Sequence, residues 1–266
     1  MKIADKIDAL APRSWQEVSK RRAFLRHLAL SACIVGSVFI VVFLIWYPRP
    51  YFTAVGAWSI VRILVGVDLV LGPLLTLVVF RPGKRLLILD MFVIGIIQCS
   101  ALIYGVNVLY QERPYYTVFA IDRFQILAYK DIPEDQRDMH DWMRKPMIGP
   151  LLAIANLPDT IEAQQQLMEE TVFGGAPDIE RRPNLWTPYE SGSDVIIERA
   201  RPLDELRSAG PTEAAKVAKI VESLDLAESE LGFFPLSSAK NEATAIVDLK
   251  TGHIIAVTDI DPWQLH

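Results

Sequence analysis

The sequence contains few of the residues from which catalytic and metal centres are built. It has 2 cysteines and 4 histidines among 266 residues. The histidines, at positions 27, 140, 253 and 266, do not recur at metal-ligand spacings with one another or with carboxylates. A GxSxG elbow, a phosphate-binding glycine loop and a dinucleotide fingerprint are also absent. We therefore expect no catalytic residue, no metal and no cofactor.

A disulfide framework is excluded as well. Cys33 and Cys99 both lie inside long apolar runs, where we interpret them as small packing residues. Residues 111–266 contain no cysteine, which suits an oxidising compartment.

Two short patterns are compatible with chemistry, but both have simpler explanations. Ser237 and Lys240 match the S-x-x-K nucleophile motif without its companion motifs, so we interpret the match as chance. A group of acidic residues lacks the glycine spacing of a calcium-binding loop, and we interpret it as a solvated acidic helix. These residues are Asp131, Glu134, Asp135, Asp138 and Asp141.

What the sequence does have is an excess of apolar residues, and they are unevenly placed. Hydrophobic residues make up 51% of the chain. Residues 1–110 carry 12 Lys and Arg against 5 Asp and Glu, whereas residues 111–266 carry 15 against 27. A basic, apolar front and an acidic, polar rear predict a membrane anchor joined to a soluble domain. The acidic excess of that domain argues against nucleic acid as a partner.

The apolar residues form three runs, each long enough to cross a bilayer as a helix of about 20 residues. Because the first run is uncharged and is followed by no small-residue cleavage site, we expect an uncleaved transmembrane helix. The predicted spans are Leu28–Tyr47, Val55–Phe80 and Leu86–Tyr110, within a membrane region of residues 27–110.

Positive charge predicts the orientation of these spans. The tail of residues 1–26 and the RPGKR loop at 81–85 are strongly basic, whereas the loop at 48–54 holds only Arg49. The positive-inside rule therefore places the amino end in the cytoplasm and residues 111–266 outside it, in the periplasm of a bacterial inner membrane. Aromatic residues near the outer ends of the spans are expected to form a belt in the lipid interface. They are Trp46, Tyr47, Tyr51, Phe52 and Trp58.

Polar residues inside the spans are the candidate functional residues. A charge at the membrane centre costs about 2.5–3.5 kcal/mol on insertion scales, so Arg62 and Asp68 need a reason to be there. Arg62 is either an interface anchor lying over Trp58 or a group that faces a partner. Asp68 and Gln98, at similar depth, either hold two helices together or face a partner or a proton path. We select Arg62, Asp68, Gln98 and Trp58 as candidate partner-binding residues.

Residues 111–266 predict a small α+β domain. Runs rich in β-formers predict hairpins at 115–130 and 243–259 and a short strand at 194–199. Helices are expected at 133–143, 159–173 and 212–226, the last because apolar residues recur at i, i+3, i+4 and i+7. The Gly- and Pro-rich residues 174–193 predict a surface loop.

Several motifs give the chain a family resemblance. They are W-Y-P-x-P-Y-F at 46–52, G-V-D-L-V-L-G-P-L-L-T-L at 66–77, F-R-P-G-K at 80–84, Y-x-x-R-P at 110–114 and V-F-x-I-D-R-F at 118–124. In this order they resemble the type IV pilin accessory protein family of the TfpX/TfpZ type. The resemblance implies a cytoplasmic-membrane protein that assists one pilin as a chaperone or modulator of pilus assembly, without catalysis. It also implies that the pilin carries an acidic residue near the start of its apolar helix, for which Arg62 would be a counter-ion.

Two other classes of function stay open at this point. One is a periplasmic sensor or ligand-binding membrane protein, which would need a pocket with convergent polar groups in residues 115–266. The other is a small membrane enzyme or transporter built around Asp68.

Overall fold

The computed structural model describes residues 18–263, so most of the predicted cytoplasmic tail, residues 1–26, lies outside the described part. The chain divides into two compact units. We call residues 18–42 and 57–110 the helical unit, and residues 43–56 and 111–263 the α+β domain. The connection at 43–56, which the sequence analysis includes in the membrane region 27–110, therefore groups with the α+β domain.

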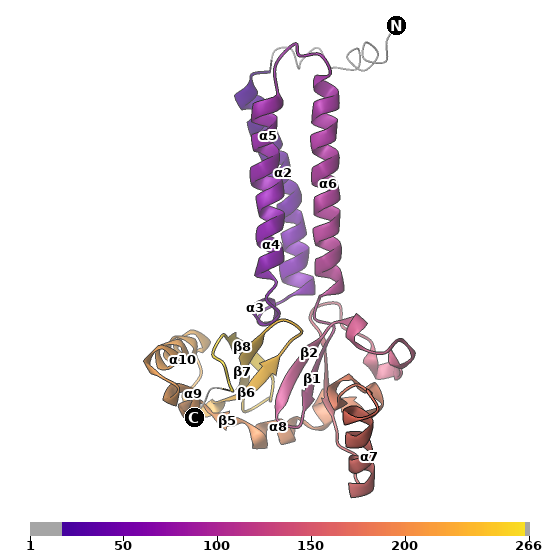
Figure 1. Ribbon diagram of the computed structural model, residues 1–266. Coiled ribbons are helices and arrows are strands. Elements are labelled where there is room, and N and C mark those ends of the chain that lie inside the picture. Colours follow the sequence, from indigo (N-terminus) through magenta and orange to yellow (C-terminus); the bar gives the residue numbers. More distant parts are fainter. Residues whose placement is uncertain (1–17, 264–266) are drawn as a thin grey trace. The chain divides into compact units, whose positions relative to one another are not determined.

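Three helical stretches are long and apolar enough to cross a membrane, as predicted. In the helical unit they run side by side (Figure 1). The first is α2 (Lys20–Val41) with a π-helical end (Val42–Trp46). The second is α4 (Trp58–Val65), a π-helical segment (Gly66–Leu71) and α5 (Gly72–Val79). The third is α6 (Leu87–Gln111).

The α+β domain is built on one eight-stranded sheet with the order β4-β3-β1-β2-β6-β7-β8, and β5 pairs with β6 beside this path. The β1–β3 and β2–β6 pairs are parallel, and the other pairs are antiparallel. The strands are β1 (Tyr116–Ala120), β2 (Arg123–Leu127), β3 (Leu151–Ala155), β4 (Trp186–Pro188), β5 (Arg201–Pro202), β6 (Leu231–Ser237), β7 (Glu242–Asp248) and β8 (Ile254–Thr258).

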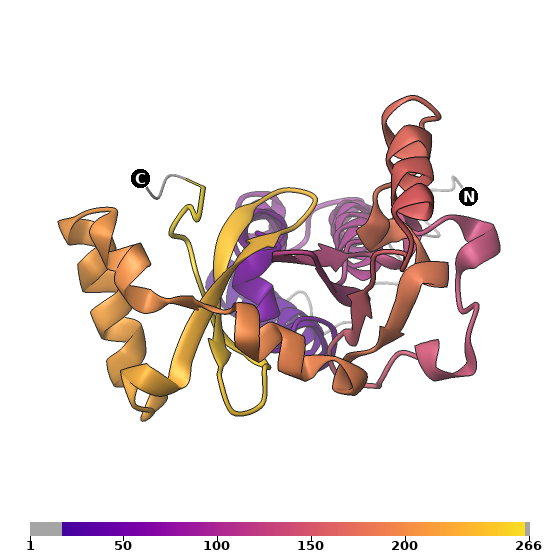
Figure 2. The same cartoon turned by 90° about the horizontal axis from the view of Figure 1, so that it is seen from below.

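Helices cover this sheet, and α7 and α10 lie toward its opposite ends (Figure 2). Both are helices that the sequence predicts, and the hairpins β1–β2 and β7–β8 are confirmed too. The helices of the domain are α3 (Tyr51–Ala54), α7 (Ile161–Val172), α8 (Ser193–Arg199), α9 (Leu203–Ser208) and α10 (Pro211–Leu224).

Three predicted elements are wrong. The surface loop expected at 174–193 contains strand β4, which pairs with β3, and its Trp186 and Tyr189 are buried. The strand expected at 194–199 is helix α8. Ile196 alone is fully buried in it, so the apolar residues need only one buried side of a short helix. The helix expected at 133–143 is replaced by two isolated 3₁₀ turns, Glu134–Gln136 and Asp141–Met143. Between these turns, the Arg137 side chain donates to the carbonyl oxygen of Ile132 (3.0 Å), which ties the chain into a loop.

Alternation along the strands divides the core between the two faces of the sheet. On β1, Tyr116, Val118 and Ala120 belong to one buried cluster, whereas Phe119 belongs to another. The second cluster also contains Ala54, from the connection between the first two spans.

This connection is a structural part of the domain rather than a lipid-facing turn. Tyr47 and Phe52 are 1% and 6% exposed, and burial raises the pKa of Tyr51 to about 12. The Ser238 hydroxyl donates to the carbonyl oxygen of Ala54 at 3.2 Å. The expectation of an aromatic belt is therefore wrong for Tyr47, Tyr51 and Phe52, because these rings pack inside the protein.

Candidate functional site

The four residues selected from the sequence fall into two different environments of the helical unit. Trp58 and Arg62 lie on the exposed side of α4. Asp68 and Gln98 are buried, with 5% and 8% of their surface exposed. The structure therefore brings Asp68 and Gln98 together and separates them from the other pair.

The buried pair is in contact where the regular helical hydrogen bonding of the second span is interrupted. The N–H of Gly72 donates five residues back, to the carbonyl oxygen of Val67. The next residue, Pro73, has no N–H to donate. The carbonyl of Asp68 is thereby left without its usual helical donor, and the side-chain amide of Gln98 donates to it at 3.4 Å. An unsatisfied carbonyl costs several kcal/mol in lipid, so this contact joins α6 to the second span at a position fixed by proline.

Gly72 makes the contact sterically possible. A Cβ atom at this position would lie 1.9 Å from the amide nitrogen of Gln98. Glycine is therefore required for the amide to reach the main chain. A second close approach, of Gly105 on α6 to the Leu64 side chain of α4, shows the same use of small residues between membrane helices.

The carboxyl group of Asp68 itself is less well satisfied. Its Oδ2 atom is buried and has no hydrogen-bond partner among residues 18–263. Because the side chain is enclosed between helices, it is not on the surface that a second protein would meet.

The exposed pair has the opposite character. Trp58 is 52% exposed at the first residue of the second span. The Arg62 Nε donates to the carbonyl oxygen of Trp58 at 3.4 Å, and no carboxylate in the described part of the chain forms an ion pair with Arg62. Arg62 lies four residues into the span, which is about 6 Å along the helix axis. It is a cation on the exposed surface of an apolar span, close enough to one end to reach a membrane interface.

Sequence reasoning missed Gly72, Pro73 and the link between His27 and Thr76. The His27 Nδ1 lies 2.5 Å from the Thr76 hydroxyl and joins α2 to α5. A Gly-Pro pair inside an apolar span was a visible signal of a break in helical hydrogen bonding. The His27 contact spans 49 residues, and spacing along the sequence does not reveal it.

Residues of both chemical patterns of the α+β domain contact other side chains of the described part. The Ser237 hydroxyl donates to Glu242 at 2.6 Å, whereas the Lys240 ammonium lies 3.8 Å from Glu112. In the acidic run, the Asp138 carboxylate accepts a hydrogen bond from the Tyr129 hydroxyl, and this bond raises the pKa of Tyr129. No group of three metal-binding side chains occurs within residues 18–263.

Comparison with known proteins identifies the family. The model of the family "Fimbrial assembly protein FimB" matches residues 15–56, which contain the first span and the connection with α3. The fimbrial assembly protein of serogroup I from Dichelobacter nodosus is 31% identical over 248 residues, covering 91% of this chain and 94% of that protein. The chain belongs to the fimbrial assembly protein family.

Other relatives of this fimbrial assembly protein come from the same organism. The protein of serogroup E1 is 31% identical over 90% of the chain, and that of serogroups C1 and C2 is 39% identical over 42% of it. No solved structure matches the chain. Membership agrees with the resemblance to type IV pilin accessory proteins and supports a role in pilus assembly.

Proposed function

We propose that this protein is a pilin-specific chaperone or modulator of the bacterial inner membrane, and that it acts by binding a type IV pilin rather than by catalysis. Family membership supports a role in pilus assembly, and the three long apolar helices support a location in a membrane. The observation that carries the proposal is the lipid-facing position of Arg62 beside Trp58.

Two opposite charges in lipid would attract each other strongly. A pilin awaiting assembly holds an acidic residue in its apolar helix, as the family resemblance implies. An unpaired charge in a membrane is unfavourable, and pairing two of them on binding recovers part of that cost. Arg62 has the right charge, and the exposed surface around it is apolar: Ile63 is 69% exposed.

Asp68 and Gln98 have a supporting role in this proposal. Their contact fixes α6 against the second span and so maintains the surface on which Arg62 is displayed. In this proposal Trp58 and Arg62 bind the pilin, whereas Asp68 and Gln98 stabilise the packing of the protein's own helices.

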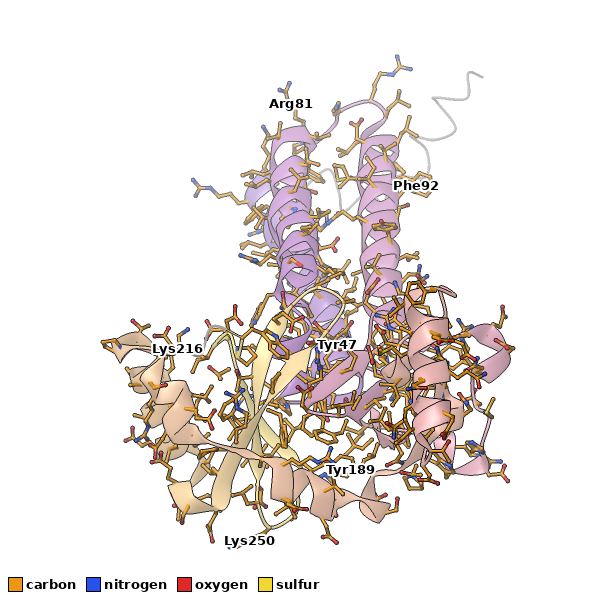
Figure 3. All side chains as sticks on the ribbon, turned by 60° about the horizontal axis from the view of Figure 1, so that its bottom comes forward. Tyr47, Arg81, Phe92, Tyr189, Lys216 and Lys250 are labelled. Carbon is orange, nitrogen blue, oxygen red and sulfur yellow. The ribbon has the colours of Figure 1, made fainter. Side chains whose placement is uncertain are left out.

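Recovery of the pilin with the tagged full-length protein from membranes tests the proposal. Arg62→Leu is expected to accumulate normally and to lose most of the pilin. Arg81→Leu is the matched control, because it removes the same charge from an exposed residue just after the same span (Figure 3). If Arg62→Leu recovers as much pilin as the parent, Arg62 is an interface anchor. If the parent recovers no pilin, the function itself is refuted.

We also propose that the α+β domain lies in the periplasm, which the positive charge of the amino-terminal half supports. The test uses a parent in which Cys33 and Cys99 are replaced by serine. A cysteine at the exposed Ser191 is expected to react with a membrane-impermeant thiol reagent when only the outer membrane is permeabilised. A cysteine at Lys84 is expected to react only after the inner membrane is lysed. The reverse pattern would refute this topology.

The absence of catalysis is part of the proposal and has its own test. Because the Ser237 hydroxyl is bonded to Glu242 rather than to Lys240, we expect Lys240→Ala to leave pilus assembly unchanged. Loss of assembly with normal accumulation of the variant would favour the S-x-x-K interpretation.

A further inference from the structure

The α+β domain has an apolar and cationic loop at the point where it joins the membrane spans. The loop is Arg144–Ile148, and we call it the 144–148 loop. Met147 is 82% exposed and Ile148 is 57% exposed, and only Pro146 separates them from the two cations Arg144 and Lys145. Two large apolar side chains that are adjacent, exposed and close to two cations form the kind of surface that contacts a lipid interface.

The carboxyl end of this loop is held against the first span. The N–H of Gly149 donates to the carbonyl oxygen of Ile45 at 3.3 Å, and Ile45 is the last residue but one of that span. Gly149 has a φ of +76°, a conformation that glycine adopts without strain. Met147 is two residues away, so its Cα lies within about 7 Å of the Gly149 Cα.

The amino end of the loop is held near the third span. The Lys145 ammonium lies over the Tyr115 ring, 5.8 Å from its centroid, and Tyr115 follows the end of α6 at Gln111 by only four residues. Burial, together with the nearby Arg113, lowers the pKa of Lys145. Two independent contacts therefore hold the loop beside the ends of two membrane spans.

From this geometry we propose that the 144–148 loop inserts Met147 and Ile148 into the interface of the lipid bilayer. The headgroup region is about 5–8 Å thick on each side, which matches the reach of the loop from Ile45. Arg144 and Lys145 complement the negative charge of anionic phospholipids, in a domain whose other charged residues are mainly acidic. The loop would thus fix the domain at the membrane surface, and this inference does not depend on pilin binding.

Spin-label depth measurements on the full-length chain in bilayers of zwitterionic and anionic phospholipids test the proposal. Cys33 and Cys99 are replaced by serine, and one nitroxide is attached at Met147→Cys. Phe173→Cys is the matched control, because this side chain is 86% exposed. Phe173 follows α7, and the carboxyl half of α7 lines a hollow together with the β1–β2 turn. That turn is at the opposite end of β1 from Tyr115.

The nitroxide at residue 147 should collide with oxygen more often, and with a water-soluble nickel complex several-fold less often, than the nitroxide at residue 173. Equal accessibility to the nickel complex at the two positions would overturn the proposal. Arg144→Glu with Lys145→Glu provides a second measurement, because it should move the label at residue 147 toward water. A label that keeps its depth in that variant would contradict the part assigned to the cations.

Discussion

The side-chain amide of Gln98 reaches the main-chain carbonyl of Asp68 (3.4 Å) at the place where Pro73 deprives the second span of a hydrogen-bond donor. Two features of the G-V-D-L-V-L-G-P motif at 66–73, and Gln98 on α6, thereby acquire one explanation. Proline frees the carbonyl, Gly72 leaves room for the amide, and the third helix supplies it. A polar residue in the middle of each of two apolar spans is then a structural link between them.

A double-mutant cycle tests this link. Gln98→Leu should lower the free energy of unfolding of the helical unit by about 0.6–1.7 kcal/mol, the range found for hydrogen bonds between membrane helices. Gly72→Ala should have a similar effect because the added methyl displaces the amide. In the Gln98→Leu background, Gly72→Ala should cost much less. Unfolding in detergent micelles gives the three values, and simple additivity would show that the two residues act separately.

The second prediction concerns the connection at 43–56. The Phe52 ring packs 4.5 Å from that of Phe43 and 6.2 Å from that of Tyr47, inside the α+β domain. Phe52→Ala should therefore destabilise this domain by about 3–5 kcal/mol, as expected for a large buried aromatic residue. Thr53→Ala, at the neighbouring exposed position, is the control and should have little effect. Thermal unfolding of the full chain measures both, and equal transition temperatures would place Phe52 outside the core.

The sequence predicts the spans and the outer hairpins well because each depends on a local pattern. A run of apolar residues determines a span, and two β-rich runs around a short turn determine a hairpin. The central strand β6 has neither signal, since it is buried throughout, lacks polar alternation and contains Pro235. Proline is rare in such a strand. On the side away from β7, however, β6 pairs with β5 at Gly232 and Phe233 and with β2 only from Leu236, so Pro235 lies between the two pairings.

The candidate site could be predicted only in part, for a related reason. Hydropathy identifies Arg62, Asp68 and Gln98 as unusual, but it does not say which side of a helix faces lipid. That depends on contacts between spans, such as Gln98 with Asp68, and on side chains far apart along the chain. Ala54 belongs to a core whose other fully buried members lie at Phe119 and beyond, and no local sequence pattern predicts this contact.

The third prediction concerns pH. The Arg182 guanidinium donates to Glu170 (2.7 Å) and Thr171 (3.0 Å), and so ties the end of α7 to the loop that follows. This contact holds the pKa of Glu170 below its usual value. Its stabilising contribution is complete above the unfolded-state pKa of about 4.3 and is lost as the pH falls through the lower folded-state pKa.

Unfolding temperatures measured from neutral pH down to acid therefore test the role of Glu170. Glu170→Gln should flatten part of the fall in stability seen in the parent. The matched control is Glu169→Gln, since the Glu169 side chain makes no hydrogen bond or ion pair within residues 18–263. It should follow the parent curve. Parallel curves for the parent and Glu170→Gln would show that the pair contributes nothing measurable.

The central claim, that the surface around Arg62 binds the pilin helix, is tested most directly by crosslinking in living cells. A photoreactive residue at Ile63 is compared with one at Phe92; these side chains are 69% and 63% exposed on different spans, and Phe92 points away from the helices (Figure 3). After irradiation, the account predicts an adduct of the size of protein plus pilin at residue 63 and much less of it at residue 92. Equal adducts at both positions, or an adduct at residue 92 alone, would contradict it.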